Sequence, residues 1–423
     1  MTGELLEQAI ALWRESPAGR PPLPRSFSPE EQAAGEEQLD RFLDGIQAEL
    51  HRLPATRAER EAARERITAA FVRFGKAVLG LEDRHLELLL GGGFSAVGTD
   101  LGRQARRFDP GVSVANILQA SRNAWTAGGL QILLGSRMRL TPSIFAYSML
   151  YPYTDNYLDD PQASREEKFG FNDRFGQRLA GEPAAPANHR EEAIWRLVGI
   201  IEEQYARGSW PAVFASLLDI HHAQENSVRL LRGGSSASAV DVLRLSFSKG
   251  GTSVLADGYL AAGTLSPEQA RFVFDWGVLL QLADDLQDVR QDCRDGVRTL
   301  FSEEAGRGPL DELTSQALRF GREVMRRMRE LPGPDCGALK ELMERSVSSM
   351  FIRSAGEAGE LYSSGYLARL ESHSPFRFSF LKARREQFAR RRGLLVRLFE
   401  AFLEGDEDEA AFPLLPASLM PRF

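Results

Sequence analysis

Apolar residues recur at intervals of three and four along most of the chain, which is the pattern of amphipathic helices. The stretches ELLEQAIALW near the start and QARFVFDWGVLLQLADDLQDV after the middle both follow this spacing. Helix start signals support the assignment, because Ser266 is a capping hydroxyl that precedes Pro267, with Gln269 at the capping-box position. Stretches that alternate polar and apolar residues are scarce. The pattern therefore predicts an all-α fold.

The distribution of proline, glycine and charge predicts one large helical domain with an extension at each end. Residues 1–60 form an N-terminal helical and proline-rich extension, residues 61–405 the main domain, and residues 406–423 an acidic, loosely held tail. The glycine-rich stretch at 91–98 is not typical of a nucleotide-binding loop, because no strand precedes it and no Gly-Lys-Ser/Thr follows it.

Composition excludes several classes of protein. A hydrophobic content of 43% with 26% charged residues over 423 positions is ordinary for a globular protein with a large core. A formal net charge of -7 argues against a nucleic-acid binder, whose phosphate contacts require a basic face. No apolar run approaches the ~20 residues of a transmembrane helix, and the N-terminus does not resemble a signal peptide. The two cysteines cannot form a zinc site or a disulfide framework. We expect a cytoplasmic protein.

The segment TDNYLDDP carries Asp155, Asn156, Asp159 and Asp160 in a helix that begins at Pro142. No lysine or arginine lies three or four positions away to relieve the repulsion, as surface helices usually provide. Asp155 and Asp159 share one face of a helix, because they are four positions apart. The segment is therefore either an acidic solvated turn or the binding site of a cation that is not a side chain.

A second acidic cluster lies in the helix that begins at Pro267. Asp284, Asp288 and Asp292 follow one face at intervals of four, and Gln281 falls on the same stripe. The rest of this helix is strongly apolar, so we do not expect the acidic face to be simply exposed to water. The alternative is an ordinary solvated helix face.

Considered together, the two clusters predict a magnesium site. Both offer only oxygen ligands, and their first aspartates lie 129 positions apart, from 155 to 284, which suits two helices that face each other across a bundle. Hard cations such as Mg²⁺ prefer oxygen ligands and retain water and phosphate in their remaining positions. A redox di-metal site would normally add Glu-x-x-His pairs, and neither cluster has one. We therefore expect Mg²⁺ and a ligand that bears phosphate.

Gly250 and Gly251 directly follow Lys249, and we expect them to interrupt a helix. An interruption would place freed backbone amides beside the lysine ammonium, which is a plausible anion site. After the second cluster, Arg298 and Thr299 could supply another anion contact. The alternative for the lysine is a structural glycine break with a solvated side chain.

Four elements in chain order closely resemble the superfamily of trans-prenyl diphosphate synthases and class I terpene synthases. They are the acidic segment at 154–161, Lys-Gly-Gly-Thr at 249–252, Gln-x-x-Asp-Asp-x-x-Asp at 281–288 and Gly-x-Arg-Thr at 296–299. The superfamily has DDxxD, a lysine-threonine break, QxxDDxxD and a glycine-lysine-x-threonine segment in the same order. The resemblance covers roughly residues 110 to 300, and the order is more specific than any single motif.

The resemblance implies a single helical bundle around a deep apolar cavity, with both acidic motifs at its mouth binding Mg²⁺ and a prenyl diphosphate. The implied metal ligands are Asp155, Asn156, Asp159, Asp284 and Asp288. The implied contacts to substrate are Lys249, Thr252, Gln281, Arg298 and Arg165, and catalysis would depend on Asp155, Asp159, Asp284 and Lys249. Aromatic residues near the motifs are candidates for the cavity wall or for ordinary core packing: Phe145, Tyr147, Tyr151, Phe272, Phe274 and Trp276.

Departures from the family pattern favour a one-substrate reaction. Asn156 replaces the second aspartate of DDxxD, and the paired arginines that follow this motif in chain-elongating members are absent. The Gly-Lys-x-x-Arg-Pro segment that holds isopentenyl diphosphate is also absent. We therefore expect a terpene synthase that ionises and cyclises one prenyl diphosphate. A chain-elongating prenyltransferase is the first alternative, and a non-catalytic prenyl-diphosphate-binding protein or partner subunit is the second. A homodimer is compatible with the sequence, which leaves the oligomeric state open.

Overall fold

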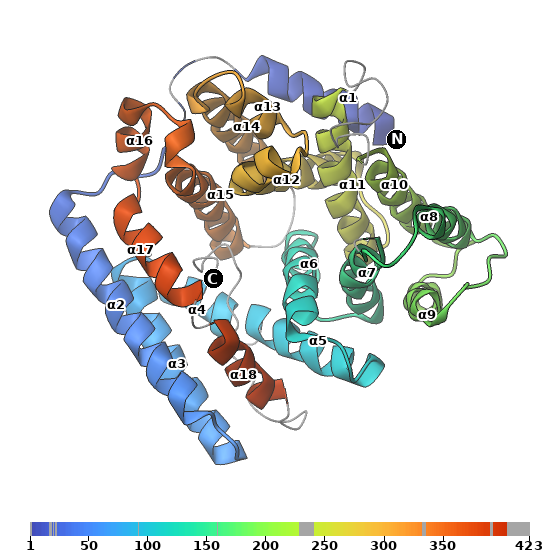
Figure 1. The fold of residues 1–423 in the computed structure, drawn as a ribbon, viewed down its shortest axis with the longest axis horizontal. Coiled ribbons are helices and arrows are strands. Elements are labelled where there is room, and N and C mark those ends of the chain that lie inside the picture. The colour runs from blue at the N-terminus through green and yellow to red at the C-terminus, as the bar shows by residue number, and fades with distance from the viewer. Residues whose placement is uncertain are drawn as a thin grey trace.

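The computed structural model describes residues 2–16, 19, 21, 23–91, 93–158, 160–227, 241–331, 336–389 and 392–403. Throughout these ranges the regular elements are helices, and no strand occurs (Figure 1). The prediction of an all-α fold is therefore confirmed. Among the described helices, none combines the length and the apolar character that a membrane span requires.

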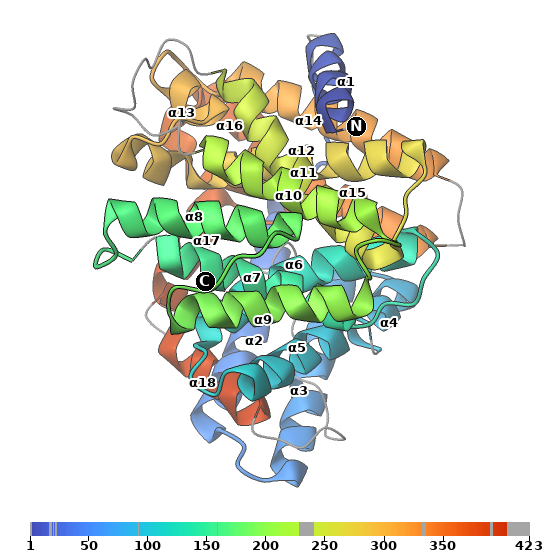
Figure 2. The same ribbon diagram turned by 90° about the vertical axis from the view of Figure 1, so that its right-hand side faces the viewer.

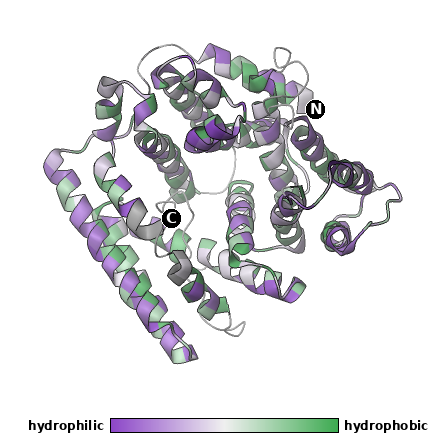
Figure 3. Ribbon diagram, viewed as in Figure 1, coloured by the Kyte–Doolittle hydropathy of each residue, from purple (hydrophilic) through white to green (hydrophobic). Residues whose placement is uncertain are grey.

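The helices in chain order are α1 (Thr2–Glu15), α2 (Pro29–Arg52), α3 (Arg57–Ala77), α4 (Asp83–Leu90), α5 (Phe94–Phe108), α6 (Val114–Leu133), α7 (Pro142–Leu158), α8 (Arg165–Ala180), α9 (His189–Gln204), α10 (Pro211–Ser227), α11 (Val242–Ala262), α12 (Pro267–Asp295), α13 (Leu300–Ala305), α14 (Asp311–Glu330), α15 (Gly337–Glu357), the 3₁₀ helix η3 (Gly359–Leu361), α16 (Ser364–Glu371), α17 (Phe378–Ala389) and α18 (Arg392–Leu403). Hydrophilic and hydrophobic residues are interspersed along them, as Figure 3 shows in the view of Figure 1.

Local sequence explains where the central helices begin and end. α12 starts with the expected capping box, in which the Ser266 hydroxyl accepts the N–H of Gln269 and the Gln269 side chain accepts the N–H of Ser266. It ends at Gly296, whose φ of 75° is left-handed and therefore suits glycine. α8 and α13 begin with capping boxes as well, at Ser164 and Thr299.

α11 and α12 form the centre of the molecule and pack against each other along their lengths. Glycines allow their backbones to touch: a Cβ on Gly250 would lie 2.6 Å from the carbonyl oxygen of Gly277, and one on Gly251 would lie 2.4 Å from the Phe274 ring. The expected break at this point is therefore wrong, because α11 continues without interruption from Val242 to Ala262. A helix-packing contact needs small residues just as a break does.

The remaining helices surround this pair. α1, at the start of the predicted N-terminal extension, packs on α11, α12 and α14, where Trp13 contacts the rings of Phe247 and Phe320. α8 lies between α9 and α10 and contacts both (Figure 2). α2 and α3 run side by side (Figure 1), and the far end of this pair shares a small apolar cluster with Leu398 and Phe402 of α18. The predicted C-terminal tail lies outside the described residues.

Candidate active site

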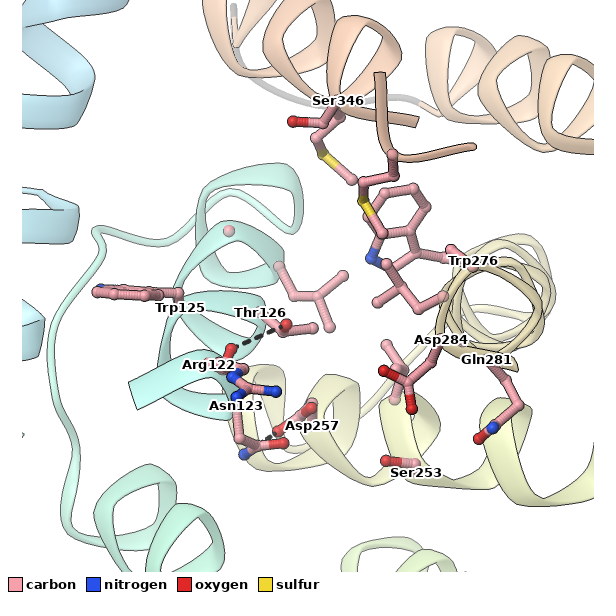
Figure 4. Close-up of a pocket in the computed structure, with 18 of the residues that line it drawn as sticks. Arg122, Asn123, Trp125, Thr126, Ser253, Asp257, Trp276, Gln281, Asp284 and Ser346 are labelled. Carbon is pink, nitrogen blue, oxygen red and sulfur yellow. Dashed lines mark hydrogen bonds between the residues drawn. The ribbon is translucent and has the colours of Figure 1, made fainter. Parts of the chain in front are cut away.

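A cavity of about 470 Å³ lies between α6, α7, α11, α12 and α15, and residues of α4 and α5 also line it (Figure 4). Along α6 the lining residues change from polar at Gln119 to apolar at Leu130. Along α12 they change from apolar at Trp276 to acidic at Asp284. α15 contributes Leu339 near its start and Arg353 near its end. Each of these helices is thus polar at one end of its cavity face and apolar at the other.

Hydrogen bonds fix the level at which α6, α7 and α11 meet. The side-chain amide of Asn123 donates to both Ser148 of α7 (3.2 Å) and Asp257 of α11 (2.9 Å). The hydroxyl groups of Tyr151 on α7 and Ser253 on α11 also share a hydrogen bond. A later position on α7 therefore matches an earlier position on α11, so the two helices are antiparallel.

This register brings the separate sequence motifs to one end of the cavity. One further helical turn places Asp155 of α7 near the level of Lys249 of α11. On the other side of α11, a Cβ on Gly250 would lie 2.5 Å from the Cβ of Gln281, which precedes Asp284 by one turn of α12. By this register Asp155, Lys249, Gln281 and Asp284, which the sequence had proposed as site residues, lie at about the same level of the bundle.

The second acidic cluster contains a buried member and an exposed one. Asp285 is buried and accepts hydrogen bonds from Ser246 (2.8 Å) and Gln281 (2.7 Å), while burial raises its pKa to about 6. Asp284 is exposed and lines the cavity. The Gln281 amide, proposed as a contact to substrate, therefore donates to a carboxylate of its own helix.

Repulsion among these carboxylates is visible at Asp292. Burial raises its pKa to about 7, the charges of Asp285, Asp288 and Asp284 add to the shift, and Lys249 opposes it. The charge of Lys249 also opposes the upward shift in the pKa of Asp285. The half-buried Lys249 ammonium therefore acts on the acidic cluster from a continuous helix, and no backbone amides are freed beside it.

The first acidic segment is divided among several environments. Asp155 is half-buried and accepts a hydrogen bond from Gln119, a residue that lines the cavity (2.8 Å). Asn156 is exposed, and Asp160 forms an ion pair with Arg190. Asp159 lies outside the described residues. One member of the segment is thus joined to the cavity, and another is used in a surface ion pair.

Three of the proposed substrate contacts have other roles in the described structure. The Thr252 hydroxyl is buried and donates to the Ser248 carbonyl oxygen of the preceding turn (2.7 Å). Arg298 donates to Glu303 (2.7 Å). Arg165 is exposed at the start of α8, with its guanidinium over the Phe169 ring.

The sequence interpretation missed the polar residues of α6 and α15. Gln119, Arg122, Asn123 and Thr126 all line the cavity and form one stripe at intervals of three and four (Figure 4). This stripe is visible in the sequence as a polar face on a helix rich in alanine and leucine. Arg353 gives no comparable signal, because only the packing of α15 against α12 brings it to the cavity.

Aromatic side chains line part of the cavity. Tyr151 and Trp276, two of the expected wall residues, line it together with Phe94 and Trp125. The other expected wall residues are buried in the protein core: Phe145, Tyr147, Phe272 and Phe274.

A separate group of Glu82, His85 and Glu341 could also be considered for a metal. Nδ1 of His85 accepts the backbone N–H of Glu82 (3.0 Å), so the ring proton lies on Nε2, which donates to Glu341 (3.1 Å). Arg84 forms ion pairs with both glutamates. The histidine therefore presents no lone pair, and the group is explained as a structural contact between α4 and α15.

Comparison with known proteins adds no assignment. No protein-family model matches the chain, and no curated protein sequence matches it either. The resemblance of the motifs therefore remains a prediction, and the chemistry of the site rests on the residues described above.

Proposed function

We propose that the protein is a Mg²⁺-dependent class I terpene synthase, which ionises an allylic prenyl diphosphate and releases diphosphate and a cyclised terpene. One observation carries the proposal: carboxylates and cationic side chains meet at one end of a cavity whose other end is apolar. A prenyl diphosphate has the same division between a charged head and an apolar chain. The cavity volume of about 470 Å³ lies within the range of ~300–1,000 Å³ that is usual for small-molecule sites.

The oxygen donors at the polar end fit Mg²⁺. Asp284 and Asp288 would hold it from α12, and Asp155 from α7. The raised pKa of Asp292 reflects burial and a concentration of negative charge, which a divalent cation would relieve. When bound, the cation would neutralise the negative charge that develops on the leaving diphosphate.

Cationic side chains at the same cavity would bind the diphosphate. Lys249 acts electrostatically on the acidic cluster, and Arg122 and Arg353 line the cavity from α6 and α15. Their attraction increases as the allylic C–O bond breaks and negative charge accumulates on the leaving oxygens, which favours the transition state over the bound substrate.

The apolar walls would protect the carbocation that remains. Leu130, Leu280 and Leu339 line the cavity and would exclude water from it, and the rings of Trp125 and Trp276 would offer π-electrons that can stabilise positive charge. The chain thus has groups for both halves of an ionisation.

The test is an incubation with geranyl, farnesyl and geranylgeranyl diphosphate in turn, each with and without isopentenyl diphosphate. We expect diphosphate and an extractable terpene from one allylic substrate alone, loss of both products with EDTA, and recovery with Mg²⁺. A longer prenyl diphosphate formed only with isopentenyl diphosphate would establish a chain-elongating enzyme instead. Full turnover after thorough chelation would contradict the metal assignment, and no turnover with any substrate would favour a binding protein.

A further inference from the structure

Asp257 is a buried carboxyl group in the cavity wall that the proposed ionisation does not use. It is 1% exposed and lines the cavity from α11. One of its oxygens accepts the Asn123 amide, and among the described residues its Oδ2 atom has no hydrogen-bond partner. An unsatisfied buried oxygen costs about 1–3 kcal/mol, so its retention calls for an explanation.

The surroundings of this carboxyl group favour its neutral form. Burial raises the pKa of Asp257 well above its usual value, and the hydrogen bond from Asn123 offsets only part of this effect. Lys249 lies eight positions earlier on α11, about 12 Å along the helix axis. A neutral carboxyl group is suited to hydrogen-bond an uncharged ligand rather than a cation.

Its position is deeper than the acidic end of the cavity. Asn123 joins Asp257 to Ser148, which lies seven positions, or about 10 Å, before Asp155 on α7. Val254 and Trp276 line the cavity at a neighbouring level, since a Cβ on Gly277 would lie 3.0 Å from Val254. Asp257 thus lies beside Asn123 and Ser253 in the cavity wall, about two helical turns from the acidic end (Figure 4).

A second polar group faces the same space. Ser253 lines the cavity four positions before Asp257, so the two side chains are neighbours on one face of α11. A water molecule needs two to four polar partners in a protein interior. The Asp257 Oδ2 atom and the Ser253 hydroxyl provide two.

We propose that Asp257 and Ser253 hold a water molecule that captures the carbocation, so that the product is a terpene alcohol. This inference rests on the function proposed above. In the capture step a lone pair of the water oxygen forms the new C–O bond to the cationic carbon. The resulting oxonium loses one proton, which the hydrogen-bonded hydroxyl groups of Ser253 and Tyr151 relay toward the diphosphate that ionisation has released. Asp257 keeps its own proton throughout and orients the water.

The experiment compares products of the wild-type protein and of Asp257→Leu, Asp257→Asn and Thr126→Val in isotopically labelled water. The wild type should yield an alcohol that carries the label. Asp257→Leu should lower the alcohol fraction at least about tenfold in favour of hydrocarbon, because it removes the hydrogen bonds of the water. Asp257→Asn should retain at least about half, because an amide still hydrogen-bonds water. Thr126→Val, which removes a cavity hydroxyl that already bonds its own helix, should match the wild type.

Release of diphosphate is measured in the same reactions and tests the proposed function separately. Diphosphate release without labelled alcohol would overturn the water site and leave the function intact. An equal loss of alcohol in Asp257→Asn and Asp257→Leu would also overturn it, because the charge of Asp257 would then be what matters. Thermal melting monitored by circular dichroism identifies a variant that has failed to fold.

A binding measurement tests the site even without turnover. Trp125 and Trp276 line the cavity, so a ligand should change their fluorescence. The wild type should bind nerolidol, a sesquiterpene alcohol, more tightly than farnesene, a hydrocarbon with the same number of carbon atoms, and Asp257→Leu should lose this preference. Equal affinity of the wild type for the two probes would contradict a hydroxyl-binding site.

Discussion

Asp155 and Asp160 lie five positions apart in one acidic segment, yet they have different partners. Asp155 accepts the amide of Gln119 beside the cavity, whereas Asp160 pairs with Arg190 at the surface. Both partners are too distant in the sequence for a local pattern to show, since Gln119 is 36 and Arg190 is 30 positions away. The local pattern therefore placed both carboxylates in one cluster, and only the family resemblance left Asp160 out of the implied metal ligands.

This difference predicts unequal effects of substitution. Asp155→Ala and Asp284→Ala should each reduce the rate of diphosphate release at least ~10²-fold, on the scale of removing an electrostatic contact in a transition state. Asp160→Ala is the matched control: it should keep near-normal activity and change the free energy of unfolding by no more than about 1 kcal/mol, as for a surface ion pair. Steady-state rates and urea unfolding measure both. Near-normal turnover of Asp284→Ala would remove the second cluster from the site.

At the scale of helices, the contact between α11 and α12 decides how Gly250 responds to substitution. A Cβ there would lie 2.6 Å from the carbonyl oxygen of Gly277, which cannot move aside as a side chain can. Gly250→Ala should therefore lower the free energy of unfolding by about 1–3 kcal/mol, the usual cost of overpacking. Gly199→Ala on α9, where a Cβ would meet no atom within 4 Å, should raise it by about 0.5–1 kcal/mol. Equal effects of the two substitutions in urea unfolding would contradict this close contact.

The packing of α10 against α8 makes stability depend on pH. His221 of α10 contacts the Phe175 ring, and burial lowers the pKa of His221 to about 4, with a further contribution from His222. Between pH 4 and the ordinary histidine value of 6.5, the unfolded chain therefore binds more protons than the folded one. Stability should fall as the pH is lowered through this range, by up to about 3 kcal/mol.

His221→Leu should flatten this acid-side slope. Asp275 acts in the opposite sense, because burial raises its pKa to about 6 and stability from this group falls as the pH rises. The difference in unfolding free energy between the variant and the wild type, measured from pH 4 to 7, isolates the histidine. An unchanged slope in the variant would show that His221 is readily protonated in the folded protein.

The sequence predicted helices well and contacts between them poorly. Helix spacing and the capping box at Ser266 are local signals, and α12 begins where they place it. The glycine pair at 250 and 251 is ambiguous, because small residues permit both a break and a close approach, and the partner Gly277 is not identifiable from the pattern. The polar stripe of α6 is visible in the sequence, but it corresponds to no motif of the family and was not predicted as part of the site.

At the scale of the whole molecule, the proposed ligand should stabilise the fold, because its contacts come from α6, α7, α11, α12 and α15 together. Mg²⁺ with inorganic diphosphate, at 100 times its dissociation constant, should add about 2.7 kcal/mol to the free energy of unfolding. Thermal shift assays should show an increase in the melting temperature of the wild type and of Asp160→Ala. An equal increase in Asp284→Ala would place the binding site elsewhere.

The backbone contact at Gly250 and Gly277 also constrains how a ligand can enter. Sliding α11 along α12 would drive a carbonyl oxygen against a neighbouring Cα, so these two helices form a rigid frame. Opening of the cavity must then come from the helices on its other sides, α6, α7 or α15. Amide hydrogen exchange should therefore be slowest in α11 and α12 and should change on ligand binding mainly in the helices that move.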